Sequence, residues 1–126
     1  MVRASRKPDR RQDRRRAERR GHWAEYLAAL FLVLKGYRVL AMRYRTRGGE
    51  IDLIVRSRNL VVFVEVKARR QAGLAIDAVG YETQNRIRSA SHQWLSRRQD
   101  THRLTLRYDV IAVLPGRFPQ HFQDAF

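Results

Sequence analysis

The sequence predicts a single α/β domain in which helices flank a mixed β-sheet. Apolar residues recur at helical spacing in two separate segments, alternating apolar residues fill a predicted hairpin between them, and one more apolar strand follows the second helix. The chain has 126 residues, 44% of them hydrophobic, which is enough for one domain with a hydrophobic core. The expected order is helix, three strands, helix, strand.

The first helix is expected over residues 18–35. Its inner face is predicted from apolar residues at helical spacing, which are Trp23, Leu27, Leu30, Phe31 and Leu34. Gly36 follows as the C-terminal cap that ends the helix. We expect Trp23, like Trp94 in the second helix, to lie in the core, and a base-stacking platform is the alternative.

Residues 1–17 are expected to form a basic arm outside the domain of residues 18–126. Residues 1–20 carry ten lysines and arginines against three acidic residues. A segment with so few apolar residues cannot bury enough surface to fold alone, so disorder or a frayed helical extension is predicted. The arm is then either a solvated tail or a nucleic-acid-binding arm.

Three strands follow the first helix. The first is expected over residues 37–44, before a turn at residues 45–49. Residues 50–57 and 60–68 then form a hairpin. Its two-residue turn suits Asn59, because asparagine tolerates a positive φ.

The alternation of the hairpin predicts its register and its two faces. Pairing the residues on either side of the turn places Asp52 opposite Glu65. Lys67 then lies on the same face, opposite Glu50. The other face is wholly apolar and is formed by Ile51, Leu53, Val55, Val62, Val64 and Val66. A shift of one residue would place acids among core residues, so this register is constrained.

A loop over residues 69–81 leads to a second helix, expected over residues 82–98. Its inner stripe is predicted to contain Ile87, Ala90, Ser91, Trp94 and Leu95. The last strand is expected over residues 104–114 and is ended by Pro115 and Gly116. Asp109 in this strand is expected to be held by hydrogen bonds, with a place beside the metal site as the alternative.

The charge of the chain points to a polyanionic partner. The formal net charge is +15 and the pI is near 11.5, values typical of proteins that bind nucleic acid or another anionic surface. The absence of cysteine excludes disulfides, zinc–thiolate sites and thiol catalysis. The longest uncharged apolar run, Tyr26–Leu34, is too short to span a membrane, and no signal-peptide cleavage site follows it. We therefore expect a cytoplasmic protein.

The acids and the lysine on one face of the hairpin are candidates for metal-dependent chemistry. Opposed strand residues are about 5 Å apart, so Asp52 and Glu65 can share a cation. Oxygen ligands favour Mg²⁺ or Mn²⁺. Lys67 can position a water, help to deprotonate it or stabilise charge on a phosphate. Glu50 is an outer member or the ion-pair partner of Lys67. The alternative for the whole cluster is an ion-paired polar patch.

Glu25 is the fourth candidate, because it is the only charged residue between Trp23 and Leu34. A carboxylate in such an apolar run needs a reason, since burying a charge without a partner is costly. Either the helix delivers Glu25 to the metal, or Glu25 lies at the exposed edge of the helix near its N-terminus. The pattern alone does not decide between the two.

Several polar and basic residues around the hairpin are candidate contacts for nucleic acid. Arg43, Arg45 and Arg47 flank the entrance of the hairpin, where they can neutralise phosphates. Gln84 and Arg86 open the second helix and can contact a phosphate or the scissile region. The alternative for these residues is a solvated surface.

Two segments together resemble a known family. Residues 48–54 read Gly-Gly-Glu-Ile-Asp-Leu-Ile, and residues 62–69 read Val-Phe-Val-Glu-Val-Lys-Ala-Arg. These motifs resemble the YraN family of small bacterial proteins, which is similar to Holliday-junction resolvases and other nucleases of the PD-(D/E)xK, restriction-endonuclease-like class. The resemblance runs from about Gly21 to Phe126 and leaves out the basic arm.

The resemblance implies a restriction-endonuclease-like core and a role for each residue of the cluster. Asp52 and Glu65 would bind the metal, Lys67 would serve the attacking water, and Glu25 would complete the site. The chain departs from the family in two places. It has Arg43 where the family usually has asparagine, and Thr83 where the family usually has a lysine that contacts phosphate.

The sequence thus favours a Mg²⁺- or Mn²⁺-dependent nuclease-like protein that hydrolyses phosphodiester bonds of DNA, including branched or damaged DNA. A non-catalytic nucleic-acid-binding protein that keeps the nuclease fold is the alternative from another class. A basic adaptor for RNA, a ribosome or an acidic protein is a third. A homodimer stays open, because resolvase-like enzymes often pair two active sites and no interface is legible in the sequence.

Overall fold

The computed structural model describes residues 10–70 and 79–126, and the side chains of the first helix from His22 onward. The helices are α1 (Arg10–Leu34) and α3 (Tyr81–Ser96), with a short 3₁₀ turn, η1 (Thr101–Arg103). The strands are β1 (Arg38–Arg45), β2 (Glu50–Ser57), β3 (Leu60–Ala68), β4 (Thr105–Val113) and β5 (Gln120–Phe122). No helix in the described ranges is long and apolar enough to cross a membrane.

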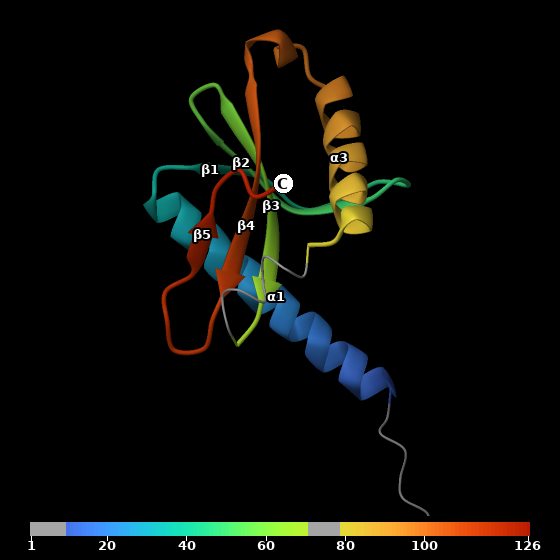
Figure 1. Cartoon of the computed structure of the whole chain (residues 1–126), viewed down its shortest axis with the longest axis vertical. Coiled ribbons are helices and arrows are strands. Elements are labelled where there is room, and N and C mark those ends of the chain that lie inside the picture. Colours follow the sequence, from blue (N-terminus) through green and yellow to red (C-terminus); the bar gives the residue numbers. More distant parts are fainter. Residues whose placement is uncertain (1–9, 71–78) are drawn as a thin grey trace, which may run out of the picture.

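The strands form one mixed sheet in the order β1-β2-β3-β4-β5 (Figure 1). All neighbours are antiparallel except β3 and β4, which are parallel. The predicted α/β class and the order helix, three strands, helix, strand are confirmed, and η1 and β5 add to them. Residues 1–9 of the expected arm and residues 71–78 of the expected loop lie outside the described residues.

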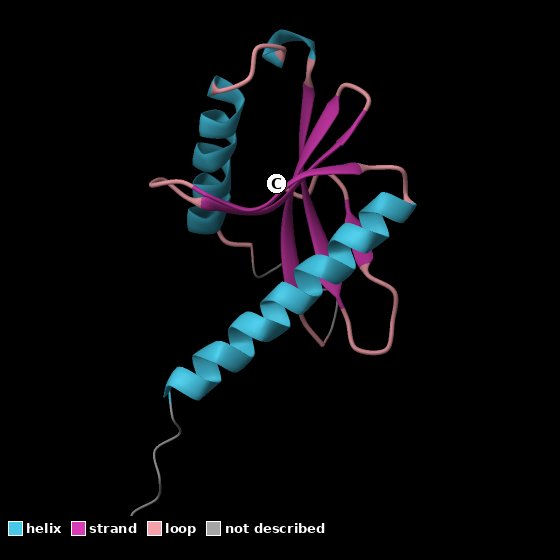
Figure 2. Cartoon of the chain, turned by 180° about the vertical axis from the view of Figure 1, so that it is seen from behind, coloured by secondary structure: helices cyan, strands magenta, loops and turns pink. Residues whose placement is uncertain are grey.

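The two helices cover opposite faces of the sheet (Figures 1 and 2). Alternate residues of β3 divide between them: Val62 and Val64 pack with α1, whereas Val61 and Phe63 pack with α3. Both faces of the central strands are therefore buried, as expected for a sheet with a parallel connection through a helix. The core has two apolar layers, one on each side of the sheet.

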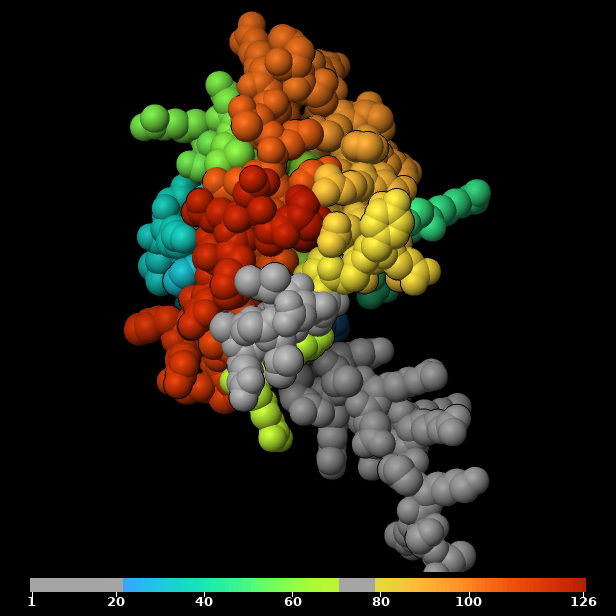
Figure 3. Space-filling view, viewed as in Figure 1, coloured from blue at the N-terminus to red at the C-terminus, as the bar shows by residue number. Residues whose placement is uncertain are grey.

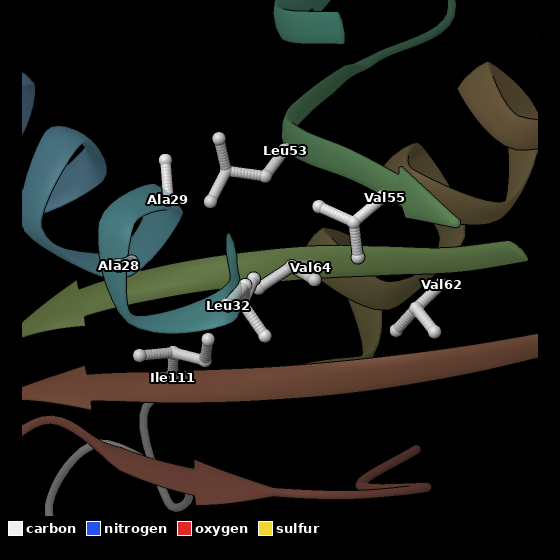
Figure 4. Close-up of a cluster of buried hydrophobic side chains, with 8 residues drawn as sticks. All are labelled: Ala28, Ala29, Leu32, Leu53, Val55, Val62, Val64 and Ile111. Carbon is white, nitrogen blue, oxygen red and sulfur yellow. The ribbon is translucent and has the colours of Figure 1, made fainter. Parts of the chain in front are cut away.

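The face that α1 turns to the sheet differs from the prediction. The buried positions are Ala24, Ala28, Ala29 and Leu32, of which the last three meet β2, β3 and β4 in Figure 4. The expected core residues Trp23 and Leu34 are instead 66% and 79% exposed, and Leu30 is also exposed. The helix carries apolar residues on two faces, and small alanine side chains let its axis approach the sheet closely. Helical spacing alone therefore selected the wrong face.

The C-terminal end of α1 agrees with the prediction, whereas its N-terminal end does not. The helix begins at Arg10, so residues 10–17 of the expected arm are helical. It ends as predicted at Gly36, whose φ of +100° is strained for residues with a side chain. Tyr37 N–H donates to the Leu32 carbonyl at 3.0 Å, which closes the cap.

The hairpin register is confirmed from Ser57–Leu60 as far as Leu53–Val64. Beyond that pair β2 leaves β3, although it stays paired with β1. The alternation of β2 breaks at the same place, because Ile51 packs on the α3 side whereas Leu53 packs on the α1 side. The expected pairing of Asp52 with Glu65 is therefore absent from the ladder.

The tight turn of the hairpin uses a different residue from the one expected. The positive φ, +56°, falls on Arg58 and not on Asn59. The Arg56 side chain donates through Nε to the Arg58 carbonyl at 2.6 Å, which holds this conformation.

Two glycines let the β1–β2 turn lie directly on α3 (Figure 1). A Cβ on Gly49 would stand 1.9 Å from the Arg86 carbonyl oxygen, which belongs to the backbone and cannot move aside. A Cβ on Gly48 would stand 2.3 Å from Ser89 Oγ. The helix is therefore close enough to present its first turns to the splayed end of β2.

Asp109 is fully buried on β4 and anchors the C-terminal segment, as its predicted hydrogen-bonded role requires. It accepts hydrogen bonds from Nε and Nη2 of Arg107, both at 2.8 Å, from Nε2 of His121 at 2.6 Å and from the Asp124 backbone N–H at 2.9 Å. Burial raises the pKa of the Asp109 carboxyl, but these donors together hold it below its ordinary value. The network fixes β5 against β4. Figure 3 shows the last residues of the chain beside α3.

Replacing Gly49 by alanine should loosen the packing of α3. Overpacking of this kind destabilises proteins by about 1–3 kcal/mol, and here the clash is with backbone, so we expect Gly49→Ala to reach at least the upper part of that range. Equilibrium urea unfolding measures the loss. Gly80→Ala is the matched control, because a Cβ there meets nothing within 4 Å. Equal stability of both variants and the parent would contradict the packing described here.

Candidate active site

A pocket of about 260 Å³ opens where β2 leaves β3, and the first turns of α3 close its other side. It is lined by Glu50, Asp52, Glu65, Lys67, Thr83, Arg86 and Ile87. Four of these are the hairpin residues expected from the sequence, so the structure brings Glu50, Asp52, Glu65 and Lys67 together. The gap between the strands supplies the space that a regular ladder would fill.

The Asp52 carboxylate takes the place of the missing ladder. Its Oδ2 accepts a hydrogen bond from the Val66 backbone N–H at 2.8 Å, a donor that β2 would otherwise satisfy. Burial raises the pKa of Asp52 and the nearby Glu65 charge adds to this rise, whereas the Val66 hydrogen bond lowers it, so that the pKa is raised to about 8 in all. Without a cation, Asp52 therefore holds a proton at neutral pH.

Lys67 pairs with the other carboxylate of the site. Its Nζ lies 3.1 Å from Oε1 of Glu65, and both side chains are largely buried. Glu50 instead pairs with Arg45, whose Nε lies 3.5 Å from its Oε1. The alternative in which Glu50 is the ion-pair partner of Lys67 is therefore wrong. A lysine held between a carboxylate and an open pocket is placed to donate to an anionic ligand.

Glu25 approaches the cluster from α1 and is only 8% exposed. The alternative of an exposed helix edge is therefore wrong. Its Oε2 lies 3.5 Å from Arg43 Nε, which is too far for a hydrogen bond, and this oxygen has no hydrogen-bond partner among the described residues. Burial raises the pKa of Glu25, the charges of Arg43 and His22 lower it, and those of Glu50 and Glu65 raise it. Glu25 thus belongs electrostatically to the site, although it does not line the pocket.

Arg43 occupies a strained position beside Asp52. Its φ is +51°, in the left-handed region that asparagine adopts more readily than arginine. Its guanidinium faces Glu25 and lies 5.9 Å from the ring centroid of Tyr26. Arg43 thus forms an internal ion pair with Glu25, and its phosphate contact stays a prediction.

The other candidate contacts for nucleic acid differ in their surroundings. Arg86 lines the pocket, and Arg47 is exposed in the β1–β2 turn. Arg45 is held by Glu50. The Gln84 side chain donates through Nε2 to the Val79 carbonyl at 3.0 Å and does not line the pocket. Of these residues, only Arg86 joins the site directly.

Sequence reasoning missed one pair of residues that line the pocket and one ion pair beside it. Thr83 and Ile87 line it one helical turn apart, and their spacing on α3 is the signal that could have placed them together. The ion pair of Arg43 with Glu25 joins β1 to α1, and no local sequence pattern predicts such a contact.

The donor set fits a hard cation held by two carboxylates. In the described part of the chain, no three His, Asp or Glu side chains converge closely enough to hold a metal. Asp52 and Glu65 alone would supply the protein oxygens, with water and substrate phosphates completing the shell, as is common for Mg²⁺. The repulsion between them is what a cation would relieve.

Comparison with known proteins places the chain in a family. Residues 24–113 match the family described as "Uncharacterised protein family UPF0102". This chain belongs to that family. The UPF0102 protein of Agrobacterium fabrum is 65% identical over 113 residues, which cover 90% of this chain and 93% of the relative. That of Rhizobium leguminosarum bv. trifolii is 59% identical over 118 residues, covering 94% and 97%.

These matches confirm the resemblance to the YraN family that the hairpin motifs indicated, and its bacterial origin. The matched segment of the UPF0102 family includes all four residues proposed as catalytic, Glu25, Asp52, Glu65 and Lys67. The arginine-rich start of the chain lies outside it.

Asp52→Asn should stabilise the protein at neutral pH in the presence of EDTA. The pKa of Asp52 is raised in the folded state, so its contribution to stability is fully present below pH 3.8 and is lost as pH rises to about 8. Asparagine keeps an acceptor for the Val66 N–H but does not titrate. Since each pKa unit is worth about 1.4 kcal/mol, we expect a gain of about 2 kcal/mol or more at pH 7, and none at pH 4.

Urea unfolding of the parent and Asp52→Asn across this pH range measures the effect. Glu82→Gln is the matched control, because Glu82 is an exposed carboxylate outside the pocket. Parallel pH profiles for the parent and Asp52→Asn would show that Asp52 ionises normally.

Proposed function

We propose that this chain is a metal-dependent nuclease that hydrolyses phosphodiester bonds of DNA, with branched or damaged DNA as its substrate class. One observation carries the proposal: Asp52, Glu65 and Lys67 share a pocket that opens between two strands of a strongly basic domain. The proposed fold relationship is to the PD-(D/E)xK, restriction-endonuclease-like nucleases and Holliday-junction resolvases. A cytoplasmic location follows from a DNA substrate in a bacterium.

Each residue of the pocket has a role in the proposed reaction. Asp52 and Glu65 would hold the Mg²⁺ or Mn²⁺ ion, which when bound would supply an activated water and neutralise charge on the phosphate. Asp52 must lose its proton to bind the ion. Lys67, anchored on Glu65 at 3.1 Å, orients the attacking water or donates to a phosphate oxygen.

Two further residues support this chemistry from the edges of the pocket. Arg86 lines the pocket from α3, where it can contact a phosphate next to the scissile one. With Thr83 in the position where the family usually has a lysine, Arg86 is the basic side chain of α3 that reaches the pocket. Glu25 adds negative charge behind the carboxylates, which favours a cation in the site.

A specific observation also favours the second candidate, a nucleic-acid-binding protein without catalysis. The described residues supply only two carboxylates close enough to share a metal, and Lys67 is already paired with one of them. If the ion pair persists in the complex, the basic surface would bind DNA while the pocket stays inert. Cleavage assays separate the two candidates.

We expect metal-dependent cleavage that requires the pocket. The substrates are labelled single-stranded, duplex, flap and four-way-junction DNA and single-stranded RNA, each with Mg²⁺, Mn²⁺ or EDTA. Asp52→Asn and Lys67→Ala should each lower the cleavage rate by about a hundredfold or more, because each removes a charge from the reacting centre. Glu82→Gln should cleave like the parent. Absence of cleavage by every form, with binding retained, would leave the non-catalytic alternative.

We also expect Mg²⁺ or Mn²⁺ to stabilise the parent and to displace a proton. A ligand at a hundred times its Kd stabilises the folded state by about 2.7 kcal/mol, so the Tm should rise by several degrees. Because the pKa of Asp52 is about 8, binding at pH 7 should release a proton, which calorimetry in two buffers of different ionisation enthalpy detects. Asp52→Asn should abolish both effects. Equal responses of parent and variant would place the ion elsewhere.

A further inference from the structure

A second, larger groove lies on the α1 side of the sheet. Its volume is about 1020 Å³, and it runs between the middle of α1, the ends of β3 and β4, and the loop that joins β4 to β5. The aromatic side chains of Trp23 and Phe118 and the prolines at 115 and 119 line it with Ala24 and Leu27. None of these residues belongs to the candidate active site.

Two aromatic side chains of this groove are unusually exposed. Trp23 is 66% exposed and Phe118 is 88% exposed. Exposed apolar side chains that border one space are typical of interaction sites. The two rings come from different elements, α1 and the β4–β5 loop, and border one space. One ligand in the groove can therefore contact both aromatic rings.

The charge of the groove selects the kind of partner. Arg69, Arg70 and Arg117 line it, and no acidic side chain among the described residues does. A second copy of the chain would bring its own net charge of +15 against these arginines. An anionic ligand with aromatic groups satisfies both features, since its charges face the guanidinium groups and its rings cover Trp23 and Phe118.

The groove and the active site lie on opposite faces of the sheet, near the same end of β3. Lys67 on β3 lines the catalytic pocket, whereas Ala68, the last residue of β3, lines the groove with Arg69 and Arg70, which follow the strand. On α1, Glu25 faces the site and Ala24 lines the groove. A nucleic-acid strand that leaves the pocket would reach the groove by passing around the end of β3.

We propose that this groove binds an unpaired nucleic-acid strand by stacking its bases on Trp23 and Phe118, while Arg69, Arg70 and Arg117 contact its backbone. Only unstacked bases present free faces to aromatic side chains, whereas a duplex hides them. The inference rests on the proposed function for the class of ligand and deepens it: the substrate carries a single-stranded segment beside the cleaved bond, as a flap, a bubble or an open junction does.

The test is binding of short labelled oligonucleotides in EDTA, where no cleavage occurs. Fluorescence anisotropy gives the Kd of single-stranded DNA, single-stranded RNA and duplex DNA. We expect Trp23→Ala and Phe118→Ala each to weaken single-strand binding by roughly tenfold, the effect of losing one stacked base, and to leave duplex binding unchanged. Single-stranded DNA and single-stranded RNA both present bases for stacking and a charged backbone, and their relative Kd values show which of the two the groove prefers.

Two control variants match the test residues. Leu30→Ala removes an exposed apolar side chain from α1 outside the groove, and Tyr81→Ala removes an exposed aromatic ring at the start of α3. Both should bind every oligonucleotide like the parent. Trp23→Phe keeps a ring for stacking and should retain binding. It should also abolish the quenching of tryptophan emission by single strands, because the other tryptophan, Trp94, is buried.

Three results would overturn the inference. They are unchanged single-strand binding in Trp23→Ala and Phe118→Ala, an equal loss of single-strand and duplex binding, and a fall in molecular mass of Trp23→Ala in sedimentation. The last would assign the groove to a second copy of the chain. The binding test does not depend on cleavage. Groove binding without cleavage would contradict the proposed function alone. Cleavage together with normal binding by the groove variants would contradict this inference alone.

Discussion

The divergence of β2 from β3 at Asp52 is the constraint on which the candidate site depends. A regular ladder would bring the strands together and leave no space between them for a ligand. Here the ladder ends at Leu53–Val64, and the Asp52 carboxylate satisfies the Val66 N–H that the departing strand leaves free. The same side chain thus compensates for the opened sheet and faces the space that opening creates. The departing end of β2 remains supported because β1 follows it.

The opened sheet would expose its polar end to water if α3 did not cover it. Gly48 and Gly49 allow the helix backbone to rest on the β1–β2 turn, so the site is walled by Thr83, Arg86 and Ile87. Desolvation then acts on carboxylates that already repel one another, which raises the pKa values of Glu25 and Asp52. A fold selected for stability alone would not gather acids here, and perturbed carboxylates in a pocket are typical of functional sites.

The sequence predicted the hairpin well because its information is local. Alternation of Leu53, Val55, Val62 and Val64 defines one core face, and the register follows from it. The splay at Asp52 could not be predicted, since the sequence alternates regularly from Ile51 to Val55, whereas the structure places Ile51 and Leu53 on opposite faces of the sheet. The orientation of α1 was misjudged for a related reason: two apolar stripes share the helix, and only the partner surface decides which is buried. The three residues of β5 are too few for a periodic signal.

The misjudged face of α1 has a functional meaning. Trp23, Ala24 and Glu25 are consecutive, so the helix points them in directions about 100° apart. Ala24 packs on the sheet, Glu25 turns toward Arg43 and the carboxylates, and Trp23 turns to the groove. Moving Trp23 into the core would rotate Glu25 away from the site. The exposed tryptophan is therefore the consequence of a helix whose orientation is set by its acid and its alanines, and the groove beside it is the surface that this orientation creates.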